Sequence, residues 1–379
     1  MINSNVLGGM NPEQFLQEYW QKKPLLIRQA FPNFESPITA DELAGLACEP
    51  EVNSRIVIEK GGDHEWQAIH GPMDEDIFAS MLETHWTLVV NDVEKYLPDF
   101  AEITDKFRFI PEWFLDDLMI SWAADQGTVG PHVDLYDVFI LQGSGTRRWQ
   151  INTQPIDENN YIPDIDLRLM KEFNPELEWI LNPGDMMYLP PGVAHHGVSL
   201  GESISYSVGY RATSHHDLLN DFMVFITEDL AIDKTYRLTD LSLQKNPNEI
   251  KPAAISQLRD IFTEYLNPNH PALESWFGRF VSDPKANYDS YSENDNVDSF
   301  EQLLSYPTLY RHPASRFAFI RKNDASQLFV DGEEYSVSFN FAKRLCHNRQ
   351  LDLEKLSINI SQDEQRLLVE LYNQHKIID

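Results

Sequence analysis

The segment that most constrains this chain of 379 residues is 130–149, which reads GPHVDLYDVFILQGSGTRRW. His132 and Asp134 lie two residues apart, and side chains two apart on an extended strand project to the same face. An imidazole nitrogen and a carboxylate oxygen on one face form half of a site for a divalent transition metal. The apolar run 138–141 that follows predicts a buried strand, so the metal half-site should lie beside the core.

A third ligand is expected from a later strand, because a 2-His-1-carboxylate face is the pattern of non-haem iron(II) oxygenases. Residues 182–200, NPGDMMYLPPGVAHHGVSL, place two adjacent histidines directly after a Pro-Pro-Gly turn. A rigid turn fixes the direction of the side chains that follow it. On this pattern His195 and His196 are both candidates for the third ligand.

A hairpin after the half-site is expected to bring a cation under the metal. Residues 143–145, Gly-Ser-Gly, predict a tight turn, and 147–151 the return strand. Arg147 and Arg148 project to opposite faces of that strand, so at most one of them points toward the metal. Upstream, residues 116–122 are interpreted as a helix end or loop passing into a strand that delivers Ser121 to the same cavity. The polar insertion 153–178 is expected to be a loop with one short helix at 167–172.

Three segments, GPHVDLYDVFILQGSGTRRWQI, GDMMYLPPGVAHHGVSL and SISYSVGYRA, together resemble the JmjC-type cupin domain of the ribosomal oxygenases. The earlier segments FLQEYWQKKPLLIRQAFPNF and DDLMISW extend the resemblance over roughly the first two hundred residues. It implies an α+β fold: a double-stranded β-helix (cupin/JmjC) barrel, then a helical dimerisation domain, then a winged-helix-like domain. It also implies Fe(II) as the metal, 2-oxoglutarate and dioxygen as cosubstrates, and hydroxylation of a protein side chain.

The resemblance assigns roles to individual residues. The family pattern PPGxxH places its ligand on His195, which gives the metal set His132, Asp134 and His195. Arg147 and Ser121 stand at the positions that hold the far carboxylate of 2-oxoglutarate, although many relatives carry Lys where this chain has Arg147. No further catalytic residue is implied beyond the metal ligands.

The expected substrate is an arginine, hydroxylated at C3, in the large-subunit ribosomal protein L-sixteen (uL16), because the resemblance is strongest to that branch of the family. Tyr136, Asp137 and the acidic residues of the insertion 153–178 are candidates to receive its guanidinium. Three alternatives remain open at this stage: a histidine hydroxylase, a methyl-lysine demethylase of another basic protein, and a non-catalytic cupin that binds ribosomal proteins.

Charge favours a basic partner. The chain has 60 acidic and 30 basic side chains, for a net charge of −30, and residues 1–213 alone hold 34 acids against 13 bases. Such a field repels nucleic-acid phosphates and attracts basic proteins. We therefore expect a basic ribosomal protein as substrate and no direct contact with nucleic acid.

Composition also predicts the compartment. The two cysteines, Cys48 and Cys346, are too few for a disulfide framework, which fits a reducing cytosol. The sequence has no export signal at its start and no run of eighteen apolar residues. A cytoplasmic protein that does not cross a membrane is expected.

The pattern changes after residue 213, and three domains are expected. Residues 1–213 form the JmjC/cupin catalytic domain. Residues 214–282 form a helical domain with helices at 216–232, 255–266 and 273–281, and because helix pairs often build two-fold dimers, we expect a homodimer. Residues 283–379 begin with a polar linker at 283–299 and continue as a winged-helix-like domain, whose 16 acids against 11 bases favour packing or partner binding over DNA binding.

Overall fold

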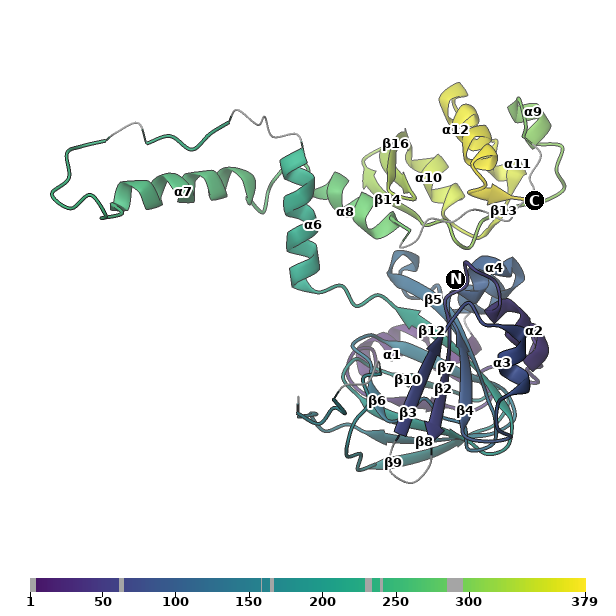
Figure 1. Ribbon diagram of the computed structural model, residues 1–379. Coiled ribbons are helices and arrows are strands. Elements are labelled where there is room, and N and C mark those ends of the chain that lie inside the picture. The colour runs from purple at the N-terminus through teal and green to yellow at the C-terminus, as the bar shows by residue number, and fades with distance from the viewer. Residues whose placement is uncertain are drawn as a thin grey trace. The chain divides into compact units, whose positions relative to one another are not determined.

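Alternating burial along strands organises the first half of the chain. In the computed structural model, residues 5–60, 65–157, 159–163, 167–228, 234–238, 241–284 and 296–379 are described. The chain divides into two units, one made of Met1–Ala212 with His312–Ala314 and the other of Thr213–Arg311 with Ser315–Asp379 (Figure 1). Both cysteines are free thiols. Among the described residues, no helix has the length and apolar character needed to cross a bilayer.

Two antiparallel sheets build the first unit. The larger has the strand order β1-β10-β7-β12-β5-β4-β2-β3, and the smaller has the order β6-β11-β8-β9. The strands are β1 (Leu25–Ile27), β2 (Ser54–Lys60), β3 (Glu65–His70), β4 (Trp86–Val90), β5 (Leu115–Ala123), β6 (His132–Val133), β7 (Val138–Ser144), β8 (Arg147–Asn152), β9 (Leu177–Leu181), β10 (Met186–Leu189), β11 (Ala194–Ser199) and β12 (Ser203–Tyr210).

The larger sheet is covered on both faces. Along β10, Met186 and Tyr188 join one apolar cluster while Met187 and Leu189 join another. The first cluster packs against short helices, and the second fills the barrel together with side chains of the smaller sheet, as alternation along a strand requires. The helical segments are η1 (Asn5–Leu7), α1 (Pro12–Glu18), α2 (Ala40–Ala47), α3 (Glu75–Ala79), α4 (Val93–Tyr96), η2 (Pro98–Phe100), α5 (Ala101–Thr104), η3 (Asp105–Phe107) and η4 (Glu112–Phe114).

Three local expectations in this unit were wrong. Residues 115–123 are one continuous strand, because β5 pairs with β12 on one side and β4 on the other. The tight turn lies at Gly145, where φ is +63° and a Cβ would stand 2.0 Å from the carbonyl oxygen of Glu202. The insertion has no helix at 167–172, since Leu169 and Met170 instead form isolated β-bridges with His132 and Tyr161.

The second unit combines helices with two small sheets. The expected helices are present as α6 (His215–Glu228), α7 (Pro252–Tyr265) and α8 (Leu273–Ser282), and positions 229–232 of the first lie outside the described residues. The sheets have the orders β14-β15-β16 and β17-β13-β18. The remaining elements are α9 (Phe300–Leu303), β13 (Leu309–Arg311), β14 (Phe317–Lys322), β15 (Ala325–Val330), β16 (Glu333–Ser338), α10 (Phe339–Leu345), β17 (Gln350–Leu351), α11 (Leu353–Leu356), α12 (Gln362–Asn373) and β18 (Ile377–Ile378).

Helix α8 packs against the sheet β14-β15-β16. The approach is close at Gly278, where a Cβ would stand 2.2 Å from the ring of Phe329, so only a hydrogen fits there. Ser282 Oγ accepts a hydrogen bond from the Gly332 N–H at 3.2 Å. Most of the expected linker, residues 285–295, lies outside the described stretches of the chain.

Candidate active site

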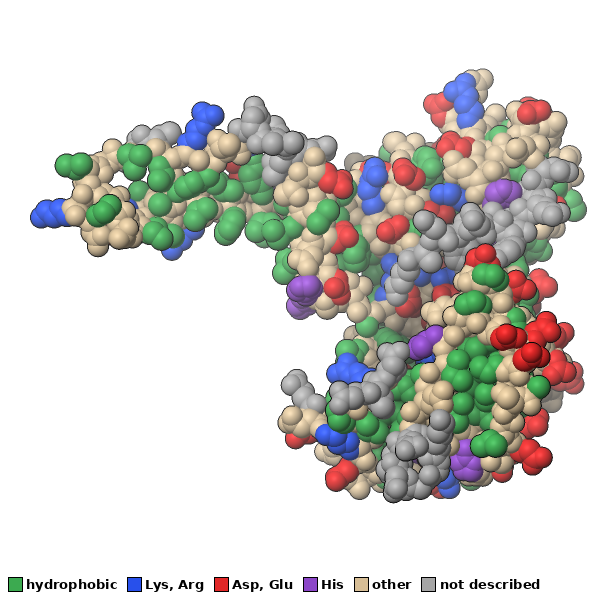
Figure 2. All heavy atoms as spheres, viewed as in Figure 1, with side chains coloured by type: hydrophobic (Ala, Val, Ile, Leu, Met, Phe, Trp, Pro, Cys, Tyr) green, Lys and Arg blue, Asp and Glu red, His purple; other side chains and the backbone are tan. Residues whose placement is uncertain are grey.

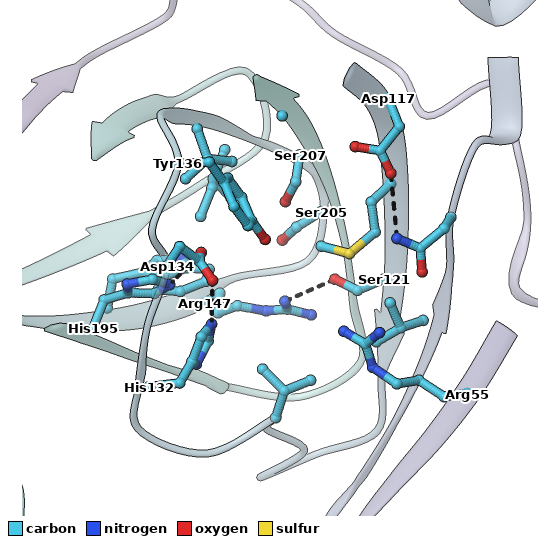
Figure 3. A pocket seen from close by; sticks show the side chains of 18 residues that line it. Arg55, Asp117, Ser121, His132, Asp134, Tyr136, Arg147, His195, Ser205 and Ser207 are labelled. Carbon is cyan, nitrogen blue, oxygen red and sulfur yellow. Dashed lines mark hydrogen bonds and ion pairs between the residues drawn. The ribbon is translucent and has the colours of Figure 1, made fainter. Parts of the chain in front are cut away.

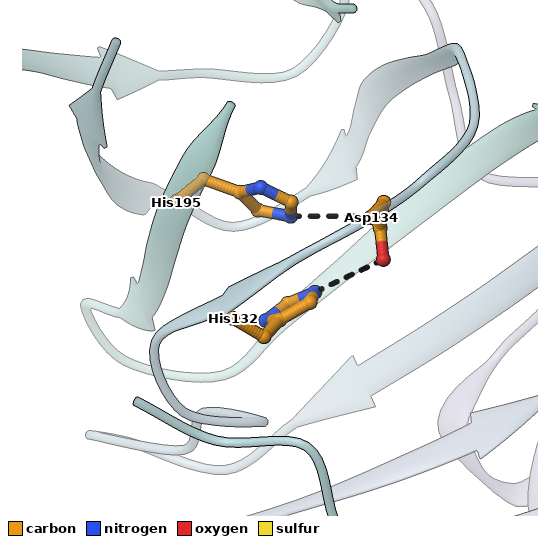
Figure 4. Close-up of side chains that lie close together, drawn as sticks. All are labelled: His132, Asp134 and His195. Atoms are coloured by element: carbon orange, nitrogen blue, oxygen red, sulfur yellow. Dashed lines mark ion pairs between the residues drawn. The ribbon is translucent and has the colours of Figure 1, made fainter. Parts of the chain in front are cut away.

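His132, Asp134 and His195 lie together inside the first unit (Figure 4). Strand β11 pairs with β6 so that His195 stands directly opposite His132, with ring centroids 4.2 Å apart. Asp134 follows β6 by one residue and places Oδ2 3.5 Å from His195 Nε2 and Oδ1 3.8 Å from His132 Nε2. One donor atom from each residue lies within 4.8 Å of the others, which makes this the one such His/Cys/Asp/Glu group among the described residues.

Backbone carbonyls fix the tautomer of both imidazoles. His132 Nδ1 lies 2.9 Å from the Gly130 carbonyl oxygen, and His195 Nδ1 lies 3.1 Å from that of Val193. A carbonyl oxygen only accepts hydrogen bonds, so each Nδ1 carries the proton and each Nε2 lone pair is free for a metal. Burial lowers the pKa of His195 to about 4, which keeps it neutral at pH 7. Two neutral nitrogens and one carboxylate fit the donor set of an Fe(II) oxygenase.

His196, the rival candidate, points to the other face of β11. Its ring makes an edge contact with Phe173 at 6.0 Å between centroids, and burial lowers its pKa to about 4. It is not part of the His132 and Asp134 group. Strand alternation therefore brings His195 and not His196 to the other two side chains.

Arg147 is a buried cation without a carboxylate partner among the described residues. Its side chain is on the inward face of β8, while Arg148 is on the outward face. Nη1 donates to Ser121 Oγ at 3.1 Å, and Nε and Nη2 both donate to Ser203 Oγ, at 3.3 and 3.1 Å (Figure 3). Burial lowers its pKa to about 10, so it stays charged at pH 7. An enclosed charge of this kind is costly unless an anion compensates it, which fits a carboxylate ligand.

One cavity joins these groups, with the triad on one side, Arg147 and Ser121 deep within it, and Asp117 farther along (Figure 3). It encloses about 130 Å³. Its lining consists of Arg55, Val89, Asn91, Asp117, Met119, Ser121, Val129, His132, Asp134, Tyr136, Val138, Ile140, Arg147, Trp149, His195, Ser205, Ser207 and Gly209.

Asp117 is a lining carboxylate that the sequence interpretation missed. Its Oδ2 accepts a hydrogen bond from Asn91 Nδ2 at 3.2 Å. Burial, reinforced by the charges of Asp92 and Asp116, raises its pKa to about 6, so it is mostly ionised at pH 7. Alternation along β5 could have identified it, because 117, 119 and 121 share one face. It was missed because the strand was expected to begin later.

Glu94 lies behind Asp117 and is buried. Burial raises its pKa to about 8, so Glu94 holds its proton at pH 7. Its Oε2 accepts the Leu118 N–H at 3.0 Å. The negative charge at this end of the cavity therefore belongs to Asp117.

Two candidates for binding the substrate have different fates. Tyr136 lines the cavity, as expected. Asp137 does not, which corrects the expectation: its carboxylate accepts hydrogen bonds from the Tyr188 hydroxyl and, at 3.0 Å, from Gln21 Nε2, outside the cavity lining. No described acid of the insertion 153–178 lines the cavity, and 158, 164 and 166 lie outside the described residues.

Comparisons with known proteins agree with this architecture. A family model described as a JmjC domain matches residues 102–218, and one described as a ROXA-like winged helix matches 267–376. The chain is 37% identical over 300 residues to the ribosomal protein uL16 3-hydroxylase of Escherichia coli K12, covering 77% of this chain and 79% of the relative. It is 34% identical over 212 residues to a probable ribosomal oxygenase of Haemophilus influenzae, covering 56% and 52%.

Solved structures extend the match to nearly the whole chain. The crystal structure of the E. coli ribosomal oxygenase YcfD superposes with a TM-score of 0.84 at 31% identity, covering 97% of this chain and 98% of that one. YcfD in complex with cobalt and 2-oxoglutarate gives a TM-score of 0.83 at 30% identity, covering 98% of both chains. The expected α+β class, with a cupin barrel and a winged-helix domain, is confirmed.

The ligand assignment predicts a sharp contrast between neighbouring histidines. His195→Ala should weaken Co(II) or Mn(II) binding by more than about 100-fold, since loss of an outer-shell partner alone costs about 10- to 100-fold. His196→Ala removes the same group one residue away and should leave the affinity within about twofold. Calorimetric titration of the full chain measures both. Equal losses in the two variants would contradict the assignment.

Proposed function

The chain belongs to the JmjC-domain ribosomal oxygenases, and from that premise we propose that it hydroxylates C3 of an arginine side chain in ribosomal protein uL16. As a member of this family it is an Fe(II)- and 2-oxoglutarate-dependent dioxygenase. The observation that supports an arginine is the carboxylate of Asp117 inside the cavity that also holds the His-Asp-His group. Its Oδ1 has no hydrogen-bond partner among the described residues and is available to a guanidinium.

The residues of this chain have separate roles in the proposed reaction. His132, Asp134 and His195 would hold Fe(II) on one face, which leaves the other face for ligands. When bound, the iron activates dioxygen while 2-oxoglutarate is converted to succinate, and this supplies the oxidising power for C–H hydroxylation. Arg147 and Ser121 would bind the far carboxylate of 2-oxoglutarate. No side chain is required as a nucleophile or general base.

Asp117 favours arginine over the alternative substrates. A neutral histidine imidazole would not compensate a buried carboxylate, whereas a guanidinium brings charge and a planar set of donors. A methyl-lysine is usually bound by a cage of aromatic rings, and the cavity lining holds only Tyr136 and Trp149. A ligand-competent iron triad also disfavours a purely binding role. The net charge of −30 supports a basic protein substrate.

The name of the E. coli relative supports the same target. That protein is a ribosomal protein uL16 3-hydroxylase. For this chain we extend the proposal to its location: a ribosomal-protein substrate calls for a cytoplasmic enzyme, and the acidic C-terminal domain is proposed to bind protein and not nucleic acid.

Incubating recombinant uL16 with this chain, Fe(II) and 2-oxoglutarate should add one oxygen atom to a single arginine. Tandem mass spectrometry of the digested protein locates the added mass, and the His195→Ala variant is the matched control. Release of formaldehyde from a methyl-lysine peptide, or oxygen on a histidine, would instead support one of the alternative reactions. Succinate formation without any modified uL16 would retain the chemistry and refute this substrate.

The proposed role of Asp117 predicts a pH effect on peptide binding. Asp117 attracts a guanidinium only when ionised, and its pKa is raised to about 6. The KM for the uL16 peptide should therefore be steady above pH 7 and rise as the pH falls through 6. Asp117→Asn should raise KM by about 10- to 100-fold, the value of a hydrogen bond to a charged group, and remove the rise below pH 6. Asp116→Asn, which changes the adjacent carboxyl outside the cavity, is the control.

We also propose that the chain forms a homodimer through α6 and α7. Helix α7 is amphipathic over 14 residues but has no buried residue, and α6 has only Phe222. Apolar side chains gather along these helices (Figure 2), and those most exposed include Leu219, Val224, Leu258 and Phe262. An amphipathic helix needs a partner for its apolar face, and a second copy of the chain can supply it by two-fold symmetry. In this proposal the chain is divided into a catalytic domain at 1–213, a dimerisation domain at 214–282 and a winged-helix-like domain at 283–379.

Light scattering should give twice the mass of one 43.9 kDa chain. Leu258→Asp with Phe262→Asp should shift the protein to the mass of one chain, because charges on the apolar face oppose its burial. Ser256→Asp with Thr263→Asp places the same charges on exposed polar positions of α7 and should preserve the dimer. A wild-type mass of one chain would refute this proposal.

A further inference from the structure

Two buried serines that have no role in the reaction proposed above form a hydrogen-bonded chain behind Arg147. We propose that Ser203 is a positioning residue that fixes which edge of the Arg147 guanidinium faces the cosubstrate, with Ser199 as its support. Selectivity for a dicarboxylate over a monocarboxylate 2-oxo acid would depend on this arrangement. The inference rests on the proposed role of Arg147 in binding 2-oxoglutarate.

Hydrogen-bond directions in this chain are fixed by chemistry. Ser203 Oγ accepts N–H bonds from Nε and Nη2 of Arg147, at 3.3 and 3.1 Å, which uses both of its lone pairs. Ser199 Oγ donates to the Gly201 carbonyl oxygen at 2.6 Å, because a carbonyl only accepts. The hydroxyl proton of Ser203 must then be donated to Ser199 Oγ, 2.6 Å away. The order is Arg147 to Ser203 to Ser199 to Gly201, and no hydroxyl in it is free to rotate.

The backbone around the two serines holds them in place. Both are buried, at 1% and 0% exposure, so water does not compete for their hydroxyls. Ser199 ends β11 and Ser203 begins β12, across a turn in which Gly201 has φ +84° and donates its N–H to Asp125 Oδ1 at 2.7 Å. Ser199 also stands directly opposite Arg147 in the pairing of β11 with β8. The acceptor for the guanidinium therefore belongs to a rigid corner of the barrel.

Capping one edge of a guanidinium selects another. Ser203 occupies the Nε–Nη2 edge, which is one of the two edges that can form parallel hydrogen bonds to a carboxylate. The Nη1–Nη2 edge is left for a ligand, with Ser121 bonded to Nη1 beside it. Without Ser203, two buried N–H groups of Arg147 would lose their acceptor, and the guanidinium could rotate to satisfy them. The binding of a distal carboxylate would suffer, whereas the 2-oxo acid group would still bind at the metal.

Two ligands of equal length separate these effects. 2-Oxoglutarate carries the distal carboxylate, and 2-oxopentanoate carries a methyl group in its place. Each is titrated calorimetrically into the full chain loaded with Co(II), without any peptide. Ser203→Ala should weaken 2-oxoglutarate binding by about tenfold and 2-oxopentanoate binding by less than about twofold. Ser199→Ala should weaken 2-oxoglutarate binding by a smaller factor, about threefold, because Ser203 keeps its oxygen but loses the acceptor of its proton.

Ser205→Ala is the matched control. Ser205 is equally buried at 1%, occupies the next inward position of β12, and donates to Gln142 Oε1 at 3.0 Å instead of contacting Arg147. It should lower the melting temperature about as much as Ser203→Ala while retaining the preference for 2-oxoglutarate. Measured melting curves for every variant show that it is folded.

Two results would overturn the positioning role: Ser203→Ala weakening both ligands by the same factor, or changing neither. A wild-type protein that binds both ligands equally well would refute the role of Arg147 itself, and the role of Ser203 with it. The choice of uL16 as substrate does not enter, because the titration contains no peptide.

Discussion

The interior of the barrel has to keep ionised and polar groups in position with little water to solvate them, and the geometry of the site follows from this constraint. Arg147 satisfies its N–H groups with serine hydroxyls, Asp117 accepts from an asparagine amide, and the two histidines donate to backbone carbonyls. Each of these supports comes from a strand or from a short connection beside one. The orientation of the side chains is therefore set before any ligand binds, which is the condition under which electrostatic interactions contribute most to catalysis. What remains uncompensated is one cation and one anion in the same cavity, each suited to a ligand of the opposite charge.

The sequence predicted the metal triad but not the groups around it. Strand alternation and a Pro-Pro-Gly turn are local features, and they placed His132 and Asp134 on one face and offered His195 for the third position. Asp137 was misplaced because the chain leaves β6 after Val133 and re-enters a strand only at Val138, so alternation does not extend through the turn between them. Ser203 supports Arg147 from 56 positions away in the sequence. That contact depends on which strands pair, and a single sequence without long-range information does not determine it.

In the second half of the chain, amphipathic patterns predicted where helices form but not what covers them. Helices α7 and α8 have similar lengths and both have an apolar face. Yet α8 buries Trp276 and packs Gly278 onto Phe329, whereas α7 buries nothing. The difference arises from the sheet β14-β15-β16, which offers α8 a surface close enough that one position has no space for a methyl group. Periodicity measures how much a helix needs a partner, and the identity of that partner is a property of the tertiary structure.

The pairing of β11 with β8 also acts as a ruler. His195 stands opposite Ile151 and Ser199 opposite Arg147, so the imidazole and the guanidinium are separated by a fixed number of residue pairs. Antiparallel strands slip in whole residues, and a slip of one would turn every inward side chain outward. The distance between the two ends of the site thus cannot drift by small steps through backbone adjustment. A change in the chain length of the accepted dicarboxylate would have to come from exchanging the cation itself, as between arginine and the shorter reach of lysine, and the barrel could remain unaltered while it did so.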